Sequence, residues 1–530
     1  MRLRNAILLF GIVNACLYSA LLPLWEGFDE AFHYAYVETL WQTKALPVLG
    51  RTLVPKDVSR SFQLAPASYI VHRQTPEATT YDAWFSLPKA EKEHRRSELD
   101  LLRPEAGSGS RPNYEAHHPP LAYILLALLD WSITKAPITV RVLVLRLFAA
   151  VFSTVLLYFG ATALCRTLEM PERVANATLF TIFCSEMLYA TIAHVANDWL
   201  AVGISALFLA ALAGFVEKPD RRAASKTALW LAAGLLTKAY FLVFALLALA
   251  VAAIMIWRRR TRVRTVLAGT LVVVALAGPW YTRNLVLYGN LGGTHEAFDG
   301  IGIRQALAAA PRIDWVATTG FLARSSLWTG NNCFTSFSRS TLNIVLALLL
   351  VAVAAWGVHR RVIRPAERMV FAAIVLFSVA IAYGTCASFA DRNGGVAGAS
   401  PWYTQVLLAP VMALAYLGMS RWKGLGRILA ASTVAIWTWV LMATWTVKLF
   451  PMYSGGGAAP MRMHDVWNWY VHGAAAHTRD LSLLALGSAP LLYAGLFVSV
   501  TLSVLLSAAI VRGLVSRPKL ARSTVKMRCD

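Results

Sequence analysis

The residues that most clearly carry chemistry follow the first apolar run, in the stretch GFDEAFHYAYVE. On a helix that begins near Gly27, Asp29 and His33 are four residues apart and share one face, with Glu30 beside them. A carboxylate here could be a helix cap. An acidic pair with a histidine at a membrane edge favours a functional site instead. We therefore predict that this stretch carries a catalytic carboxylate.

A second set of ionisable side chains stands at later edges of apolar runs. Glu115, His117 and His118 lie in NYEAHHPPLAY, just before a short apolar stretch. Asp198 lies in AHVANDWLAV, where it could also cap the helix that follows. Ionisable groups at membrane depth are functional candidates by default, so we take all four as candidate site residues.

Basic and amide side chains at similar positions suggest what the carboxylates work with. Lys238 lies in the break LLTKAY, and Arg283 and Asn284 end a later apolar run. A carboxylate can deprotonate an acceptor hydroxyl, whereas Lys and Arg can hold a phosphate and stabilise the charge it gains on departure. A phosphate on a lipid would reach this depth from within the bilayer. The histidines and carboxylates could instead bind a divalent metal, but their spacing does not support one, so we expect no metal and no cofactor.

The composition is that of an all-α polytopic membrane protein. Of 530 residues, 57% are hydrophobic and only 15% are charged, and apolar runs of spanning length recur along the chain. The net charge of +22 is explained by basic cytoplasmic loops, so we expect no nucleic-acid partner. The six cysteines lie far apart without a CxxC or a close Cys/His pair, which supports neither a zinc site nor a disulfide framework.

The apolar runs predict about 12 membrane spans. A run over residues 227–257 is broken near Lys238 and has basic flanks at both ends, so we predict a pair of short helices that turns there. The other predicted spans lie near residues 6–25, 142–164, 174–193, 197–215, 263–282, 341–358, 369–387, 402–419, 428–448 and 486–511.

One further apolar stretch, residues 118–133, decides the topology. It is short, opens with two prolines and carries Asp130. If it spans, the basic C-terminal tail and most other basic loops face outward. If it only dips into the membrane, these loops collect on one side, as cytoplasmic loops do. We therefore predict a dipping helix, both termini in the cytoplasm, and the candidate site on the outer face of the membrane.

This topology divides the chain into segments. Residues 50–112 are charged and contain Pro and Ser, and we predict a small or partly ordered extramembrane insertion without catalytic residues. The predicted segments are a first transmembrane helix (1–25), a first outer loop with juxtamembrane helices and this insertion (26–141), a transmembrane module (142–283), an outer loop (284–340), and a C-terminal transmembrane region (341–530) with an outer loop at 449–485.

Taken in order, these segments resemble bacterial GT-C glycosyltransferases. Those are polytopic enzymes that use polyprenyl-phosphate-linked sugars and are related to protein O-mannosyltransferases and lipid A aminoarabinose transferases. SSLWTGNNCF (residues 325–334) is a looser match, and the resemblance covers roughly residues 25–335. The matching segments are GFDEAFHYAYVETLWQTKALPV, YEAHHPPLAYILLAL, HVANDWLAVGISAL, GLLTKAYFLVF and GPWYTRNLVLYGNLGG.

The resemblance implies a GT-C fold and direct displacement at the anomeric carbon, which inverts its configuration and releases polyprenyl phosphate without a cofactor. It implies that Asp29 is the catalytic base, with Glu30 beside it and Asp198 as a second acidic position. The implied partners are a polyprenyl-phosphate sugar donor, membrane lipids, and a lipid, glycan or protein acceptor.

The same resemblance places the donor. His118 would help to frame the donor site, and Lys238 and Arg283 match positions that would hold the lipid phosphate. The chain departs from related proteins at PWYTQVLLAP (residues 401–410), where an Arg-containing motif is usual and Arg392 lies several residues upstream.

Two other functions stay open from the sequence. An O-antigen-type polymerase or ligase also handles polyprenyl-linked sugars, and MHDVWNWYVH (residues 463–472) keeps that possibility, although we interpret this stretch as an interfacial segment. A lipid-linked sugar transporter or flippase would place charges mid-span and often has two similar halves. In this chain the charges lie at the outer membrane edge, and the two halves are not similar.

Overall fold

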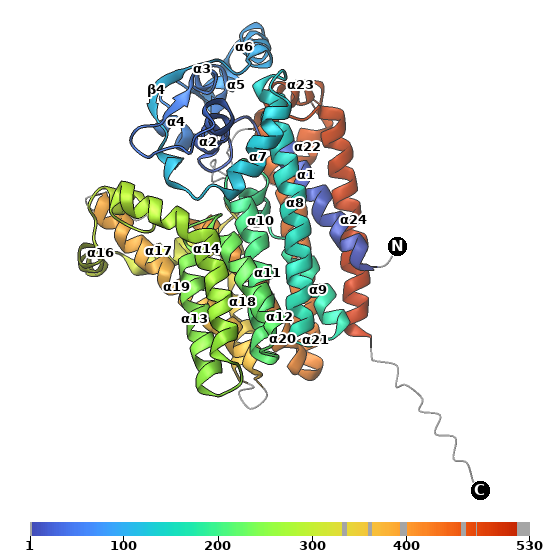
Figure 1. Ribbon diagram of the computed structural model, residues 1–530. Coiled ribbons are helices and arrows are strands. Elements are labelled where there is room, and N and C mark those ends of the chain that lie inside the picture. Colours follow the sequence, from blue (N-terminus) through green and yellow to red (C-terminus); the bar gives the residue numbers. More distant parts are fainter. Residues whose placement is uncertain are drawn as a thin grey trace.

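The computed structural model describes residues 3–330, 337–358, 363–392, 400–456, 463–472 and 474–516, and this part of the chain is largely a helix bundle (Figure 1). The predicted segment 325–334 is described only as far as residue 330. Nine helices in the described ranges are long and apolar enough to cross a membrane. They are Leu3–Leu21 (α1), Ile138–Thr167 (α8), Asp198–Glu217 (α11), Val263–Tyr288 (α14), Arg339–Val358 (α18), Pro365–Asp391 (α19), Pro401–Arg421 (η5 and α20), Gly424–Gly456 (most of α21 and the π-helical turns after it) and Ala489–Val515 (α24).

The other predicted spans are shorter helices. The predicted span at 174–193 is interrupted and consists of α9 (Glu172–Ile182) and α10 (Glu186–Ile192). The run at 227–257 is a helix pair, as predicted, formed by α12 (Arg221–Leu235) and α13 (Phe241–Trp257). At 1.5 Å per residue these helices reach at most about 26 Å, somewhat less than a typical hydrocarbon core.

A folded segment lies between α1 and α8, at one end of the bundle (Figure 1). The stretch predicted as a partly ordered insertion contains short helices and two small sheets, in which β1 pairs antiparallel with β4 and β2 pairs parallel with β3. The elements between α1 and α7 are α2 (Glu30–Thr43), β1 (Leu53–Pro55), α3 (Lys56–Leu64), β2 (Pro66–Ala67), α4 (Tyr69–Gln74), β3 (Thr79–Thr80), α5 (Tyr81–Ser86), α6 (Lys89–Leu101), β4 (Ser108–Pro112) and η1 (Tyr114–His117).

The helix after this segment, α7 (Leu121–Ser132), is too short to span. Its length is about 18 Å, against a hydrocarbon core of about 30 Å, which agrees with a helix that does not cross. Leu128 and Trp131 are more than half exposed. On the opposite face the buried Asp130 pairs with Arg141 of α8, with 2.5 Å between Oδ2 and Nη2. The face of α7 that carries Asp130 therefore packs on the bundle, and the face with Leu128 and Trp131 is apolar and exposed.

Helices α8 and α11 pack closely against each other. A Cβ added to Gly160 of α8 would lie 2.7 Å from the Cβ of Ala206, and one added to Gly203 of α11 would lie 2.6 Å from the Cβ of Leu156. Small residues allow such close approach of helix backbones. The N-terminal end of α11 is therefore fixed relative to α8.

The remaining elements lie beyond α14. They are α15 (His295–Phe298), α16 (Ile303–Ala309), η2 (Ala310–Arg312), α17 (Trp315–Ser325), η5 (Pro401–Leu407), α20 (Leu408–Arg421), α21 (Lys423–Ala443), π-helical turns at Thr444–Leu449 and Met452–Gly456, α22 (Met463–Val471) and α23 (Ala474–Leu484).

Candidate active site

Asp29 immediately precedes α2 and has an unusual backbone conformation. Its φ of 54° and ψ of 19° lie in the left-handed region, which Asp tolerates better than most residues. Its side chain makes no capping hydrogen bond. Instead, Oδ1 accepts hydrogen bonds from the Tyr114 hydroxyl at 2.6 Å and from the Gln74 amide at 3.1 Å. The helix-cap interpretation therefore does not account for this half-buried carboxylate, which other side chains orient.

Glu30 occupies a different environment, although it is the next residue. It is buried, and Arg146 donates to both of its oxygens, from Nε to Oε1 at 2.7 Å and from Nη2 to Oε2 at 2.5 Å. Val195 adds a backbone N–H at 2.9 Å. Burial alone would raise the pKa of Glu30, but the Arg146 guanidinium holds that pKa below its usual value. The Glu30 carboxylate is therefore buried and paired with Arg146, and the catalytic role predicted for Glu30 stays a prediction.

The loop before α2 packs closely against the chain that leads into α11. A Cβ added to Gly27 would lie 2.5 Å from the Cβ of His194. Only glycine leaves room for this approach, which brings the segment carrying Asp29 to the N-terminal end of α11, where Asp198 lies.

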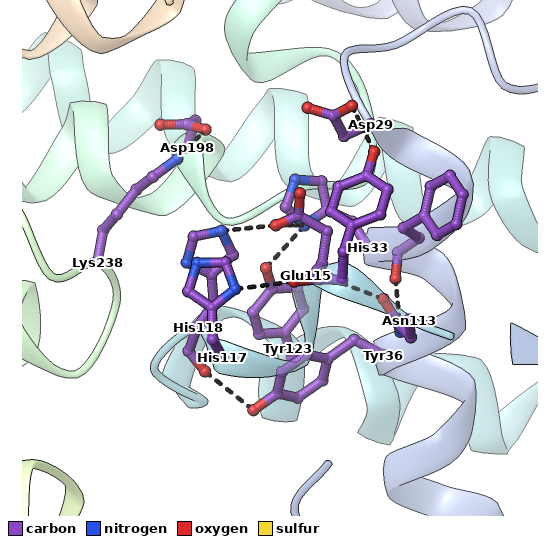
Figure 2. A network of polar contacts seen from close by, with 12 residues as sticks. Asp29, His33, Tyr36, Asn113, Glu115, His117, His118, Tyr123, Asp198 and Lys238 are labelled. Carbon is purple, nitrogen blue, oxygen red and sulfur yellow. Dashed lines mark hydrogen bonds and ion pairs between the residues drawn. The ribbon is translucent and has the colours of Figure 1, made fainter. Parts of the chain in front are cut away.

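A buried cluster of histidines surrounds Glu115 (Figure 2). The Oε2 atom of Glu115 lies 2.6 Å from Nε2 of His118 and 3.7 Å from Nδ1 of His33. His33 Nδ1 is also 2.7 Å from the Tyr123 hydroxyl. The rings of His117 and His118 are 4.0 Å apart between centroids. We call Glu115, His33, His117 and His118 the Glu115 cluster.

The environment of the Glu115 cluster favours uncharged side chains. Burial lowers the pKa of His117 to about 3, and burial also holds the pKa of His33 and His118 well below the usual value. Burial, followed by the nearby charge of Asp29, raises the pKa of Glu115 well above its usual value. The imidazoles are therefore neutral at pH 7, with a lone pair available on one nitrogen each.

Asp198 and Lys238 form a buried ion pair beside this cluster (Figure 2). Asp198 is the first residue of α11, after the N-cap Asn197, and Lys238 lies in the turn between α12 and α13. Lys238 Nζ is 4.6 Å from the centroid of the Tyr403 ring, and Tyr240 places its hydroxyl 3.4 Å from Asp198. The carboxylate of Asp198 thus pairs with Lys238 and does not cap α11.

Arg283 and Asn284 lie apart from the Glu115 cluster. Arg283 donates to the carbonyl of Pro47 at 2.6 Å and packs on the Trp280 ring, 4.8 Å from its centroid. Asn284 is buried and donates to the carbonyl of Leu291 at 3.3 Å. The predicted site residues that the structure brings together are Asp29, His33, Glu115, His117, His118, Asp198 and Lys238; those outside are Glu30, Arg283 and Asn284.

Comparison with known proteins identifies the family. The family described as "Predicted membrane protein (DUF2142)" matches residues 9–403, most of the chain. The chain belongs to the DUF2142 family. No curated protein sequence matches this DUF2142 chain.

Solved structures similar to this DUF2142 chain include two of ArnT from Cupriavidus metallidurans. The form bound to undecaprenyl phosphate has 14% sequence identity and a TM-score of 0.45, over 97% of this chain and 76% of ArnT. The apo form has 14% identity and a TM-score of 0.41, over 91% of this chain and 75% of ArnT. At this level of similarity, chemistry has to be argued from the side chains of the DUF2142 protein itself.

The structure adds residues to the site that the sequence did not single out. Tyr114 and Gln74 orient Asp29, and Arg146 holds Glu30. His295, whose Nε2 is 2.7 Å from the carbonyl of Tyr114, stacks edge-on against His117. Tyr114 stands beside Glu115 in the printed sequence and could have been found there, whereas the other three come from distant segments without a motif.

Proposed function

We propose that this DUF2142 protein is a GT-C-type membrane glycosyltransferase that moves a sugar from a polyprenyl-phosphate-linked donor to an acceptor hydroxyl. The transfer takes place on the outer face of a bacterial inner membrane. The observation that carries this proposal is the carboxylate of Asp29, which is not used as a cap, is oriented by Tyr114, and lies beside a buried polar cluster. The sequence resemblance to GT-C glycosyltransferases supports the same assignment.

Asp29 acts as general base in this proposal. Its Oδ1 is held by Tyr114 and Gln74, and its Oδ2 accepts no hydrogen bond from the residues that the structure describes. Oδ2 takes the proton of the acceptor hydroxyl while the acceptor oxygen attacks the anomeric carbon. The bond from that carbon to the phosphate oxygen breaks, the oxygen keeps the electron pair, and the configuration inverts. A positioned base contributes about 10²- to 10⁴-fold to such a step.

Lys238 stabilises the departing phosphate in this proposal. It is the buried cation next to the Glu115 cluster, and the faces of two tyrosines surround it. Asp198 acts through Lys238, because its carboxylate pairs with the Lys238 ammonium and fixes its position. Arg283 lies outside the Glu115 cluster, and its predicted contact with the lipid phosphate stays a prediction; its Nη1 is buried without a hydrogen bond from the described part of the chain. Cations placed where phosphate gains charge lower the barrier electrostatically.

Replacing Asp29 with Asn tests the proposal directly. Asp29→Asn keeps the size and the acceptor oxygen of the side chain but cannot take a proton, so we expect transfer to fall about 10²- to 10⁴-fold. The matched control is Asp82→Asn, which changes an exposed carboxylate on α5. The measurement is the glycolipid and glycan profile of a deletion strain complemented with each variant, by mass spectrometry.

The possible outcomes separate the candidate functions. Accumulation of intact sugar–lipid in the Asp29→Asn strain, with normal protein in the membrane, supports the base. Undiminished transfer in that strain would exclude it. A transporter or flippase would leave the sugar–phosphate bond intact in every strain, including the one with the unaltered protein.

A further inference from the structure

Three ligand-bearing side chains converge in the short segment EAHH, residues 115–118. One ligand atom from each of Glu115, His117 and His118 lies within 4.8 Å of the other two, and the side chains are buried. We propose that these three residues form a binding site for a divalent transition metal of the zinc type. The proposal concerns metal binding alone and does not depend on the proposed glycosyl transfer.

The short helix η1 and its C-cap residue carry these side chains. Glu115 and His117 belong to η1, and His118 follows as the C-cap, with its backbone N–H donating to the carbonyl of Glu115 at 3.3 Å. Asn113 anchors the turn: its Oδ1 accepts the N–H of Glu115 at 3.0 Å, and its Nδ2 donates to the carbonyl of Phe32 on α2 at 3.0 Å. The arrangement is therefore fixed by the fold before any ligand binds.

His117 is held in the way that suits a metal ligand. Its Nδ1 is 2.9 Å from the carbonyl of Tyr114, a contact that requires Nδ1 to carry the proton. The lone pair is then on Nε2. Metal-bound histidines almost always donate their other ring N–H to a carbonyl or carboxylate in this manner, which fixes both the tautomer and the ring orientation.

One buried nitrogen of the cluster, His118 Nδ1, makes no hydrogen bond with the residues that the structure describes. Glu115 Oε2 is 2.6 Å from His118 Nε2, and no other described atom donates to it. Buried polar atoms of this kind are costly and require an explanation, such as an ion. The nearby cation Lys238 is already paired with Asp198. A divalent ion would satisfy the carboxylate and an imidazole together.

The donor set selects the kind of metal. Two imidazoles and one carboxylate suit zinc and its neighbours, whereas magnesium and calcium favour oxygen ligands. Three protein ligands leave one tetrahedral position open, as in catalytic rather than structural zinc sites. Tetrahedral ligands at about 2.1 Å from zinc are about 3.4 Å apart, so binding requires small side-chain rotations that draw the three atoms together.

The test uses the full-length protein, purified in detergent with an affinity tag that contains no histidine and stripped with a chelator. Zinc chloride is added and binding is followed by calorimetry and by elemental analysis after dialysis. We expect one tightly bound equivalent per chain, and a thermal transition that rises with zinc because the metal binds the folded state. Cobalt should give the weak visible absorption of a site without thiolate ligands.

Variants locate the site. His117→Ala and Glu115→Gln should each weaken zinc binding at least about tenfold, and the double variant His117→Ala/His118→Ala should abolish it. The matched control is His94→Ala, which changes an exposed histidine on α6 and should bind as the unaltered protein does.

Two results would overturn the proposal. One is unaltered protein that binds no zinc after stripping, a measurement that needs no variant to fold. The other is equal affinity in the unaltered protein and in the double variant when both show the same metal-free thermal transition.

Discussion

Asp29, the proposed general base, has a backbone conformation that its surroundings must maintain. A left-handed backbone at a non-glycine residue costs of order 1–3 kcal/mol and persists only where the surroundings impose it. Here Glu30, the next residue, is locked to Arg146, and Gly27 packs against His194. The strained position lies between these two anchors. Its effect is to turn the carboxylate away from the helix end, where it would otherwise cap α2, toward Tyr114.

Tyr114 is a positioning residue in the proposed reaction, and its hydroxyl can be removed alone. Tyr114→Phe deletes the 2.6 Å hydrogen bond to Asp29 Oδ1. A hydrogen bond to a charged group is worth about 1.5–3 kcal/mol, so we expect kcat to fall about ten- to a hundredfold. The donor contacts are elsewhere, so KM for the donor should stay within about twofold. Initial rates over a series of donor concentrations in proteoliposomes measure both constants.

The control for this change is Tyr416→Phe. That hydroxyl contacts Thr181 at 2.6 Å inside the helix bundle, outside the Glu115 cluster. A fall in KM and kcat together in Tyr114→Phe, or an equal loss in Tyr416→Phe, would contradict a role in orienting Asp29.

At the scale of elements, the ion pair between Glu30 and Arg146 joins the start of α2 to α8. Arg146 also donates to the carbonyls of Leu22 and Pro23, so one side chain fixes the whole connection from α1 to α2. Since α8 packs closely on α11, the segment with Asp29 and the helix end with Asp198 share one support. Glu30 therefore helps to hold together the elements that carry Asp29 and Asp198.

Breaking this ion pair should be costly. Glu30→Gln leaves the Arg146 guanidinium buried without a counter-ion, and we expect a loss of about 3–5 kcal/mol in the free energy of unfolding. The control is Glu91→Gln, which removes a partly exposed pair with Arg95 and should cost at most about 1 kcal/mol. Thermal unfolding of both variants in one detergent gives the comparison; similar transitions would mean that Arg146 does not anchor α2.

The helices could be predicted from the sequence more fully than the side-chain partners. The break at Lys238 was visible because basic residues flank the run on both sides, and the structure confirms two helices there. The partner of Glu30 was not visible, since Arg146 is 116 residues away in an otherwise ordinary apolar helix. The candidate metal ligands were named from the sequence, but spacing could not show that the 3₁₀ turn brings their ligand atoms together. His295 was missed because it is a lone histidine whose neighbours come from another segment.

At the scale of the whole molecule, the polar chemistry gathers at one end of the bundle. Asp29, Glu115 and the ion pair of Asp198 with Lys238 belong to four separate segments, yet each interacts electrostatically with the next. The folded segment around residues 50–112 lies over this end (Figure 1) and contributes Gln74 to it. In the proposed reaction, this site would receive the lipid-borne sugar from the membrane and the acceptor hydroxyl from the aqueous side.

The side of the membrane on which this end lies is a prediction of the charge distribution, and it can be measured. Ser97 on α6 and Ser225 on α12 are both exposed serines, the first in the folded segment between α1 and α8 and the second beside a cluster of basic residues. In a chain whose native cysteines are replaced by serine, an impermeant thiol reagent added to spheroplasts should label Ser97→Cys and leave Ser225→Cys unlabelled until the membrane is opened. Basic loops face the cytoplasm, which is the reason for this expectation. The reverse labelling pattern would place Asp29 in the cytoplasm, where the acceptors and donors of outer-face transfer are out of reach.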